Sequence, residues 1–126
     1  AILKDNTVQK QLDGVSILPL LQGKSIADRA LYWHFPAYLE MYKKDRAFED
    51  SQGKPYFRTT PVSVIRAGDW KLLEYFETGE LELYNLATDI GERNNLLQIN
   101  PTKASELHQK LKEWQSQTDA FIPKNN

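Results

Sequence analysis

The sequence predicts an α+β domain in which a four-stranded antiparallel sheet packs against a C-terminal α-helix. Three short runs rich in β-branched and aromatic residues follow one another between residues 61 and 86, with turn residues between them. A fourth run of the same kind lies upstream, at residues 29–35. After residue 101, apolar side chains recur at steps of three and four, which indicates one amphipathic helix.

Residues 1–25 are expected to form an N-terminal connecting segment. Five apolar side chains lie between Gly14 and Gly23, and either a helical turn or a strand could carry them. We favour a turn at Asp13-Gly14 followed by a short helical turn that Pro19 breaks, because proline cannot donate to a strand ladder. The chain begins at Ala1 without an initiator Met, so we expect a processed or excised piece.

The first strand is expected at Arg29 to Phe35, and Pro36 ends it. Alternation places one apolar set on one face and a less apolar pair on the other: Leu31, Trp33 and Phe35 against Tyr32 and His34. His34 is the candidate functional residue, because it is titratable and lies near a strand end. The competing interpretation is a structural histidine with satisfied hydrogen bonds, and it is the more frequent one for a histidine between two aromatic residues.

Residues 38–60 are charged and lack a clear period, so we expect a long loop. Loops beyond about 12 residues without regular structure are often functional covers or disordered segments. A surface loop held by aromatic side chains is favoured slightly over a lid that contacts substrate.

Three strands are then expected in a meander, at Val62 to Ala67, Trp70 to Phe76 and Leu81 to Asn85. The dipeptides Gly68-Asp69 and Thr78-Gly79 separate them and allow the backbone to reverse. A helix is expected near Pro101 to Thr118, with Asn100 as its cap residue. Its apolar stripe, which should face the sheet, consists of Ala104, Leu107, Leu111 and Trp114.

Composition indicates one domain spanning residues 1–126, since 40% hydrophobic residues in a chain of this length suit a single core. The formal net charge of −1 gives no argument for nucleic acid, and no apolar run approaches the roughly 18 residues of a membrane span. Cysteine is absent, and there is no nucleophile elbow or spaced cluster of metal ligands. We therefore do not expect a complete enzyme within these residues.

Four stretches in register resemble the C-terminal part of the arylsulfatase-type, formylglycine-dependent sulfatases. They are DGVSILPLLQG at residues 13–23, LYWHFP at 31–36, SVIRAGDWKL at 63–72, and ELYNL at 82–86 followed by Asp89, Glu92 and Asn95-Leu96. Two features depart from the family pattern. Ala37 stands where many bacterial members have a second histidine, and the connection at residues 38–60 is longer than in many relatives.

The resemblance implies a sulfuric ester hydrolase of the alkaline phosphatase-like superfamily, whose catalytic N-terminal α/β domain is not in this sequence. In that domain a formylglycine, made from Cys or Ser, acts as nucleophile beside a Ca²⁺ ion, and none of those residues can be assigned here. The resemblance further implies a sulfated carbohydrate substrate, an intramolecular partner in the catalytic domain, and a periplasmic or extracellular location. His34 matches the histidine of the family's Trp-His-Phe-Pro stretch, which implies a hydrogen bond to substrate.

Two alternatives stay open. The chain could be a stand-alone binding or interaction module without catalysis, or the same part of a related phosphoester hydrolase. A Cys/Ser-x-Pro-x-Arg motif upstream in the parent reading frame would favour the sulfatase.

Overall fold

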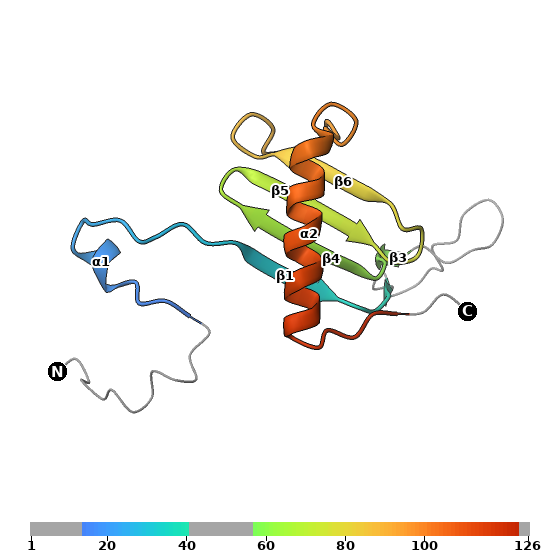
Figure 1. The fold of residues 1–126 in the computed structure, drawn as a ribbon, viewed down its shortest axis with the longest axis horizontal. Helices are drawn as coiled ribbons and strands as arrows, with labels where there is room; N and C mark the ends of the chain where they lie inside the picture. The colour runs from blue at the N-terminus through green and yellow to red at the C-terminus, as the bar shows by residue number, and fades with distance from the viewer. Residues whose placement is uncertain (1–13, 41–56, 124–126) are drawn as a thin grey trace, which may run out of the picture.

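The computed structural model describes residues 14–40 and 57–123. Its elements in chain order are α1 (Leu18–Leu21), β1 (Leu31–Phe35), β2 (Leu39–Glu40), β3 (Phe57–Thr59), β4 (Val62–Ala67), β5 (Trp70–Tyr75), β6 (Leu81–Asn85) and α2 (Pro101–Gln117). Strands β1, β4, β5 and β6 form one antiparallel sheet in the order β1-β4-β5-β6. Helix α2 runs across one face of this sheet (Figure 1), which confirms the predicted fold class.

The core lies between the sheet and α2. The register aligns Ile65 with Leu72 and Leu72 with Leu83, so one row of apolar side chains crosses three strands. These side chains are fully buried against the apolar stripe of α2, which the sequence placed correctly on its inner face: Ala104, Leu107 and Leu111, with Trp114 half-buried beside them. On the outer face, Lys110 donates to Glu106 at 2.8 Å, one helical turn away.

The two hairpin turns of the meander fall where the sequence predicts them. Gly68, between β4 and β5, has a φ of 59°, a left-handed conformation that costs little without a Cβ atom. The ends of the predicted elements shift by one or two residues, since β1 starts at Leu31, β5 ends at Tyr75 and α2 ends at Gln117. The ladder between β1 and β4 begins with the pair Leu31 and Arg66, which sets the start of β1.

The faces of β1 are the less expected finding. Its less apolar face points toward α2, where Tyr32 stacks on Trp114 with ring centroids 4.9 Å apart and 3° between the planes. The more apolar face points the other way, and Trp33 there is 52% exposed. Tyr32 pairs with Ile65, so the buried row of β4 and β5 determines which face of β1 is inside.

Two further expectations are corrected. Residues 38–60 are not a loop throughout, because β2 and β3 pair antiparallel at its two ends, while residues 41–56 lie outside the described residues. Pro19 does not break the helical turn but lies in the first turn of α1, where the proline ring is tolerated. The expected cap position of α2 is confirmed, since Asn100 is its N-cap residue and Pro101 opens the helix, although the Asn100 side chain makes no capping hydrogen bond. Over the described ranges 14–40 and 57–123, neither helix has the length and apolar character needed to cross a membrane.

Candidate functional site

His34 lies in a polar row that crosses the helix-facing side of the sheet. The register places it beside Ser63 of β4, which in turn lies beside Glu74 of β5. Its Nδ1 is 2.6 Å from the hydroxyl oxygen of Ser63, and its Nε2 is 2.8 Å from the carbonyl oxygen of Phe121. Because a carbonyl oxygen only accepts, Nε2 carries the proton, and in the neutral ring Nδ1 accepts from Ser63. Both ring nitrogens of His34 are therefore engaged.

Aromatic rings surround His34 on the same side. Phe76 and Trp114 lie edge-on to the imidazole, with centroids at 5.7 and 6.4 Å. Phe121 belongs to the segment that follows α2. This segment turns back toward the sheet, and the Ala120 amide donates to the Gln115 carbonyl at the turn. The sequence could not place this segment, because no periodic pattern follows residue 118.

The row His34, Ser63 and Glu74 has the residue types of a hydrolytic triad but not the arrangement. A triad needs the histidine between the nucleophile and the acid, and it needs an accessible hydroxyl. Here Ser63 lies between the other two and is 0% exposed. The row therefore supplies buried hydrogen bonding rather than nucleophilic catalysis.

Glu74 is the centre of a polar cluster that the sequence interpretation missed. Its carboxylate accepts from Gln115 at 3.0 Å, lies 3.1 Å from His108 Nε2 and pairs with Lys112. Burial favours the neutral acid, but hydrogen bonds from Lys112, Gln115 and His108 outweigh it and hold the pKa of Glu74 below its usual value. Strand alternation could have indicated its burial, because Glu74 lies two residues after the buried Leu72 and so faces the same side of β5.

Stability should therefore depend on the charge of Glu74. A carboxyl whose pKa is lowered by folding stabilises the fold above its unfolded pKa, here 4.5, and this contribution is lost as pH falls through the lower folded value. We expect the free energy of unfolding of Glu74→Gln to fall less steeply than that of the parent chain as the pH drops below about 4.5. Urea unfolding at several pH values measures this, with Glu113→Gln on the exposed face of α2 as control. Parallel pH curves for the parent chain and Glu74→Gln would contradict it.

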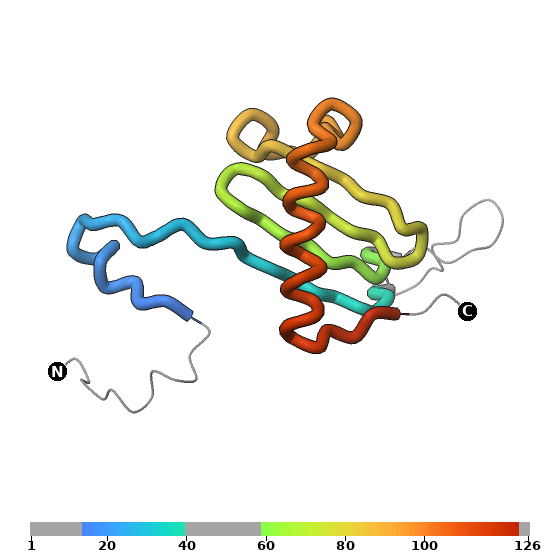
Figure 2. The backbone as a smooth tube through the Cα atoms, in the orientation of Figure 1, coloured from blue at the N-terminus to red at the C-terminus, as the bar shows by residue number. Residues whose placement is uncertain are grey.

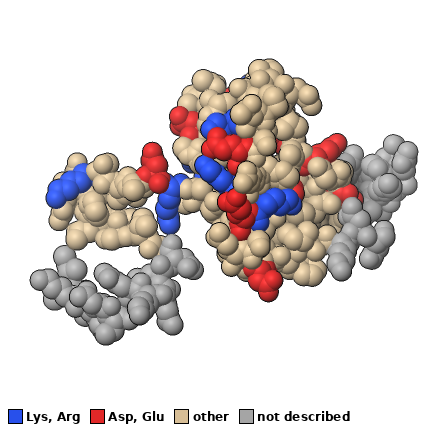
Figure 3. All heavy atoms as spheres, viewed as in Figure 1, with Lys and Arg blue, Asp and Glu red and all other residues tan. Residues whose placement is uncertain are grey.

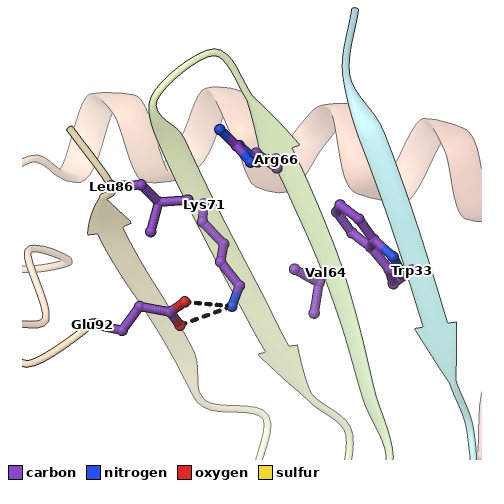
Figure 4. Close-up of a pocket in the computed structure, with 6 residues that line it drawn as sticks. All are labelled: Trp33, Val64, Arg66, Lys71, Leu86 and Glu92. Carbon is purple, nitrogen blue, oxygen red and sulfur yellow. Dashed lines mark hydrogen bonds and ion pairs between the residues drawn. The ribbon is translucent and has the colours of Figure 1, made fainter. Parts of the chain in front are cut away.

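The opposite face of the sheet carries a pocket of about 340 Å³. Figure 4 shows its lining, with α2 behind the sheet: Trp33, Val64, Arg66, Lys71, Leu86 and Glu92. Lys71 Nζ donates to both carboxylate oxygens of Glu92 at 2.8 Å. This ion pair anchors the loop after β6 to the sheet.

The rest of this face is mostly apolar and aromatic, with the carboxylate of Glu82 accepting from the Tyr75 hydroxyl at 3.1 Å. Phe35 is 40% exposed, and Val62, Leu73 and Tyr75 are half-buried. Burial first, and then the Glu82 carboxylate, raises the pKa of Tyr75 to about 12 and that of Tyr84 to about 12, so both hydroxyls stay protonated near neutral pH. Neither described helix lies over this face, which we call the open face (Figure 1).

No group of three or more His, Asp or Glu side chains is placed to hold a metal ion in the part of the chain that the structure describes. Cys is absent from the sequence. The described residues form a packed unit in which α2 covers one face of the sheet and neither described helix covers the other.

Comparison with known proteins finds similarity to sulfatases. The chain is 34% identical over 118 residues to a protein named Sulfatase from Formosa agariphila, in a match that covers 83% of this chain and 18% of that protein. No protein-family model matches. The structure of BT4656 in complex with its substrate D-glucosamine-2-N,6-O-disulfate matches 90% of this chain with a TM-score of 0.59 and 26% identity.

Sequence and fold thus agree that this chain is similar to one part of a sulfatase, and the resemblance to the C-terminal part of these enzymes is confirmed. The chain spans 18% of the length of the relative and 22% of the solved chain.

Proposed function

We propose that this chain is the C-terminal part of a sulfuric ester hydrolase that acts on sulfated carbohydrate. The similarity to a named sulfatase supports the reaction type, and the disulfated glucosamine that BT4656 takes as substrate supports the substrate class. The catalytic machinery, including any formylglycine and Ca²⁺, lies in the larger portion of such a polypeptide. The periplasmic or extracellular location stays a prediction.

The open face is the structural observation that supports this proposal. An apolar face with a half-exposed Trp33 beside Arg66 has the residue types that dominate stable interfaces. The relatives are about five times longer than their match to this chain, which supports the catalytic portion of the same polypeptide as the occupant of the open face. The unit would then pack through its sheet and present the end of β1 to the rim of the substrate pocket.

Activity measurements test the proposal. Residues 1–126 alone should show no hydrolysis of 4-nitrophenyl sulfate above a buffer blank, with or without Ca²⁺, because they contain no cysteine and no Ser-x-Pro-x-Arg stretch from which a formylglycine could be made. The longer polypeptide should hydrolyse this ester and should prefer it to 4-nitrophenyl phosphate.

Either of two results would overturn the assignment. Turnover by residues 1–126 alone would place a catalytic group within them. A preference of the longer polypeptide for the phosphate ester would make it a related phosphoester hydrolase. The matched pair of esters separates these outcomes, since both release the same chromophore.

A further inference from the structure

The segment before β1 carries a second apolar surface, separate from the open face. We call residues 14–24 the arm. Five of its side chains are large, apolar and 39 to 76% exposed: Val15, Ile17, Leu18, Leu20 and Leu21. Helix α1 buries none of its own residues. In Figures 1 and 2 the arm lies away from the sheet and α2, and the chain runs from it directly into β1.

The arm has a defined shape although it packs on no described element. The amide of Leu21 donates to the carbonyl of Ile17 at 3.2 Å, and the amide of Lys24 donates to the carbonyl of Pro19 at 2.9 Å. Ser16 accepts from the amide of Leu18 at 3.2 Å through its hydroxyl. Gly23 closes the turn with a φ of 72°.

A helix of this length does not persist in water by its own hydrogen bonds, because four residues are far below the length at which isolated helices become stable. Five exposed apolar side chains on such a turn are the pattern of a surface that is buried against another body. The arm carries Lys24 as its one charged residue, and in Figure 3 most of this lobe is neither acidic nor basic. Its partner surface should therefore be an apolar groove.

The length of the relatives supports a partner within the same polypeptide. Residues 31–126 make up about three quarters of the chain, so the match to BT4656 over 90% of it must include part of the first 30 residues. The segment before β1 therefore has a counterpart within a continuous chain of which the match covers 22%.

We propose that the arm is an anchor that inserts its apolar side chains into a groove of the larger catalytic portion of the same polypeptide. This inference rests on the proposed function for the identity of the partner. The arm and the open face would then hold the unit at two separate places.

Substitutions at two neighbouring positions test the anchor. Leu21 is 76% exposed here, and Gln22 beside it is an exposed polar residue. In the longer polypeptide, Leu21→Asp should lower the melting temperature by about 5 °C or more, since a charge would replace a buried apolar group. Gln22→Asp, the matched control, should change it by less than about 1 °C. In residues 1–126 alone, both variants should leave the melting temperature unchanged.

Tryptic cleavage after Lys24 gives a second measurement that does not require a folded variant. Cleavage there should be fast in residues 1–126 alone and at least tenfold slower in the longer polypeptide. Equal effects of Leu21→Asp and Gln22→Asp in the longer polypeptide, together with equal cleavage rates, would overturn the anchor.

Two other outcomes would overturn the choice of partner. A lower melting temperature for Leu21→Asp in residues 1–126 alone would mean that the arm folds back on its own sheet. A dimer of residues 1–126 that Leu21→Asp dissociates, seen by sedimentation, would make a second copy the occupant. If the longer polypeptide shows no aryl sulfatase activity while the anchor results hold, the arm still docks on the larger portion, and only the proposed enzyme activity is wrong.

Discussion

Replacing Trp114 with alanine is expected to lower the free energy of unfolding of this chain by about 3 to 5 kcal/mol. The indole stacks on Tyr32 at 4.9 Å and meets the His34 ring edge-on at 6.4 Å, so it joins α2 to the edge strand β1. It also packs against the buried cluster of leucines between sheet and helix. Alanine would leave a cavity there and remove the aromatic contact, and both losses add to the cost.

Urea denaturation followed by circular dichroism measures the change, and Trp33→Ala provides the matched control. Trp33 is 52% exposed on the opposite face, so its loss from residues 1–126 should cost less than about 1 kcal/mol. If Trp114→Ala also costs less than about 1 kcal/mol, α2 is peripheral to the fold rather than part of its core.

The meander and the helix could be predicted because their local patterns agree with their final environment. In β4 and β5 the apolar side chains that alternate inward, such as Ile65 and Leu72, become the core. The stripe of α2 follows the same rule. Where one face of an element is buried within this chain, the period of the sequence is sufficient to find it.

The same rule is misleading on β1, because both of its faces are apolar or aromatic. The large apolar side chains of Trp33 and Phe35 are typical of a core, yet they lie on the open face. Tyr32 and His34 face α2 instead. An apolar set that is not needed by the core of the unit is the mark of an interface. Alternation identifies the two faces but not the body that covers each of them.

The Glu74 cluster lay beyond sequence reasoning for a different reason. Its members come from β5 and from α2, 34 to 41 residues apart, and only the packing of helix on sheet brings them together. In retrospect His108, Lys112 and Gln115 recur at helical spacing on one side of α2. Their common partner could not be named without the position of the helix.

His34 illustrates both limits, because the sequence singled it out and the structure adds partners that no pattern contains. Its match to a family stretch and its place at the end of β1 support the proposed role in the substrate pocket. Its hydrogen bonds to Ser63 and to the carbonyl of Phe121 give it a part in the fold as well. The two roles make different predictions for the same substitution.

His34→Ala in the longer enzyme is expected to lower kcat/KM by about 10- to 1000-fold, on the order of 1.4 to 4 kcal/mol, if the imidazole donates one hydrogen bond to a substrate oxygen. Nε2 is the nitrogen that would donate, since it carries the proton, and a substrate oxygen would have to replace the Phe121 carbonyl oxygen that accepts this proton in the structure. The melting temperature should fall too, because Ser63 is fully buried and an unpaired buried hydroxyl costs about 1 to 3 kcal/mol.

Ser63→Ala separates the two effects. It removes the partner of Nδ1 and leaves Nε2 in place, so it should disturb the fold around His34 while keeping kcat/KM within about threefold, under 1 kcal/mol of transition-state stabilisation. Steady-state kinetics with a sulfated glucosamine and thermal unfolding of both variants supply the comparison. If His34→Ala and Ser63→Ala lower the melting temperature alike and both retain kcat/KM, the imidazole is a structural residue that joins β1, β4 and the C-terminal segment, and the substrate role is wrong.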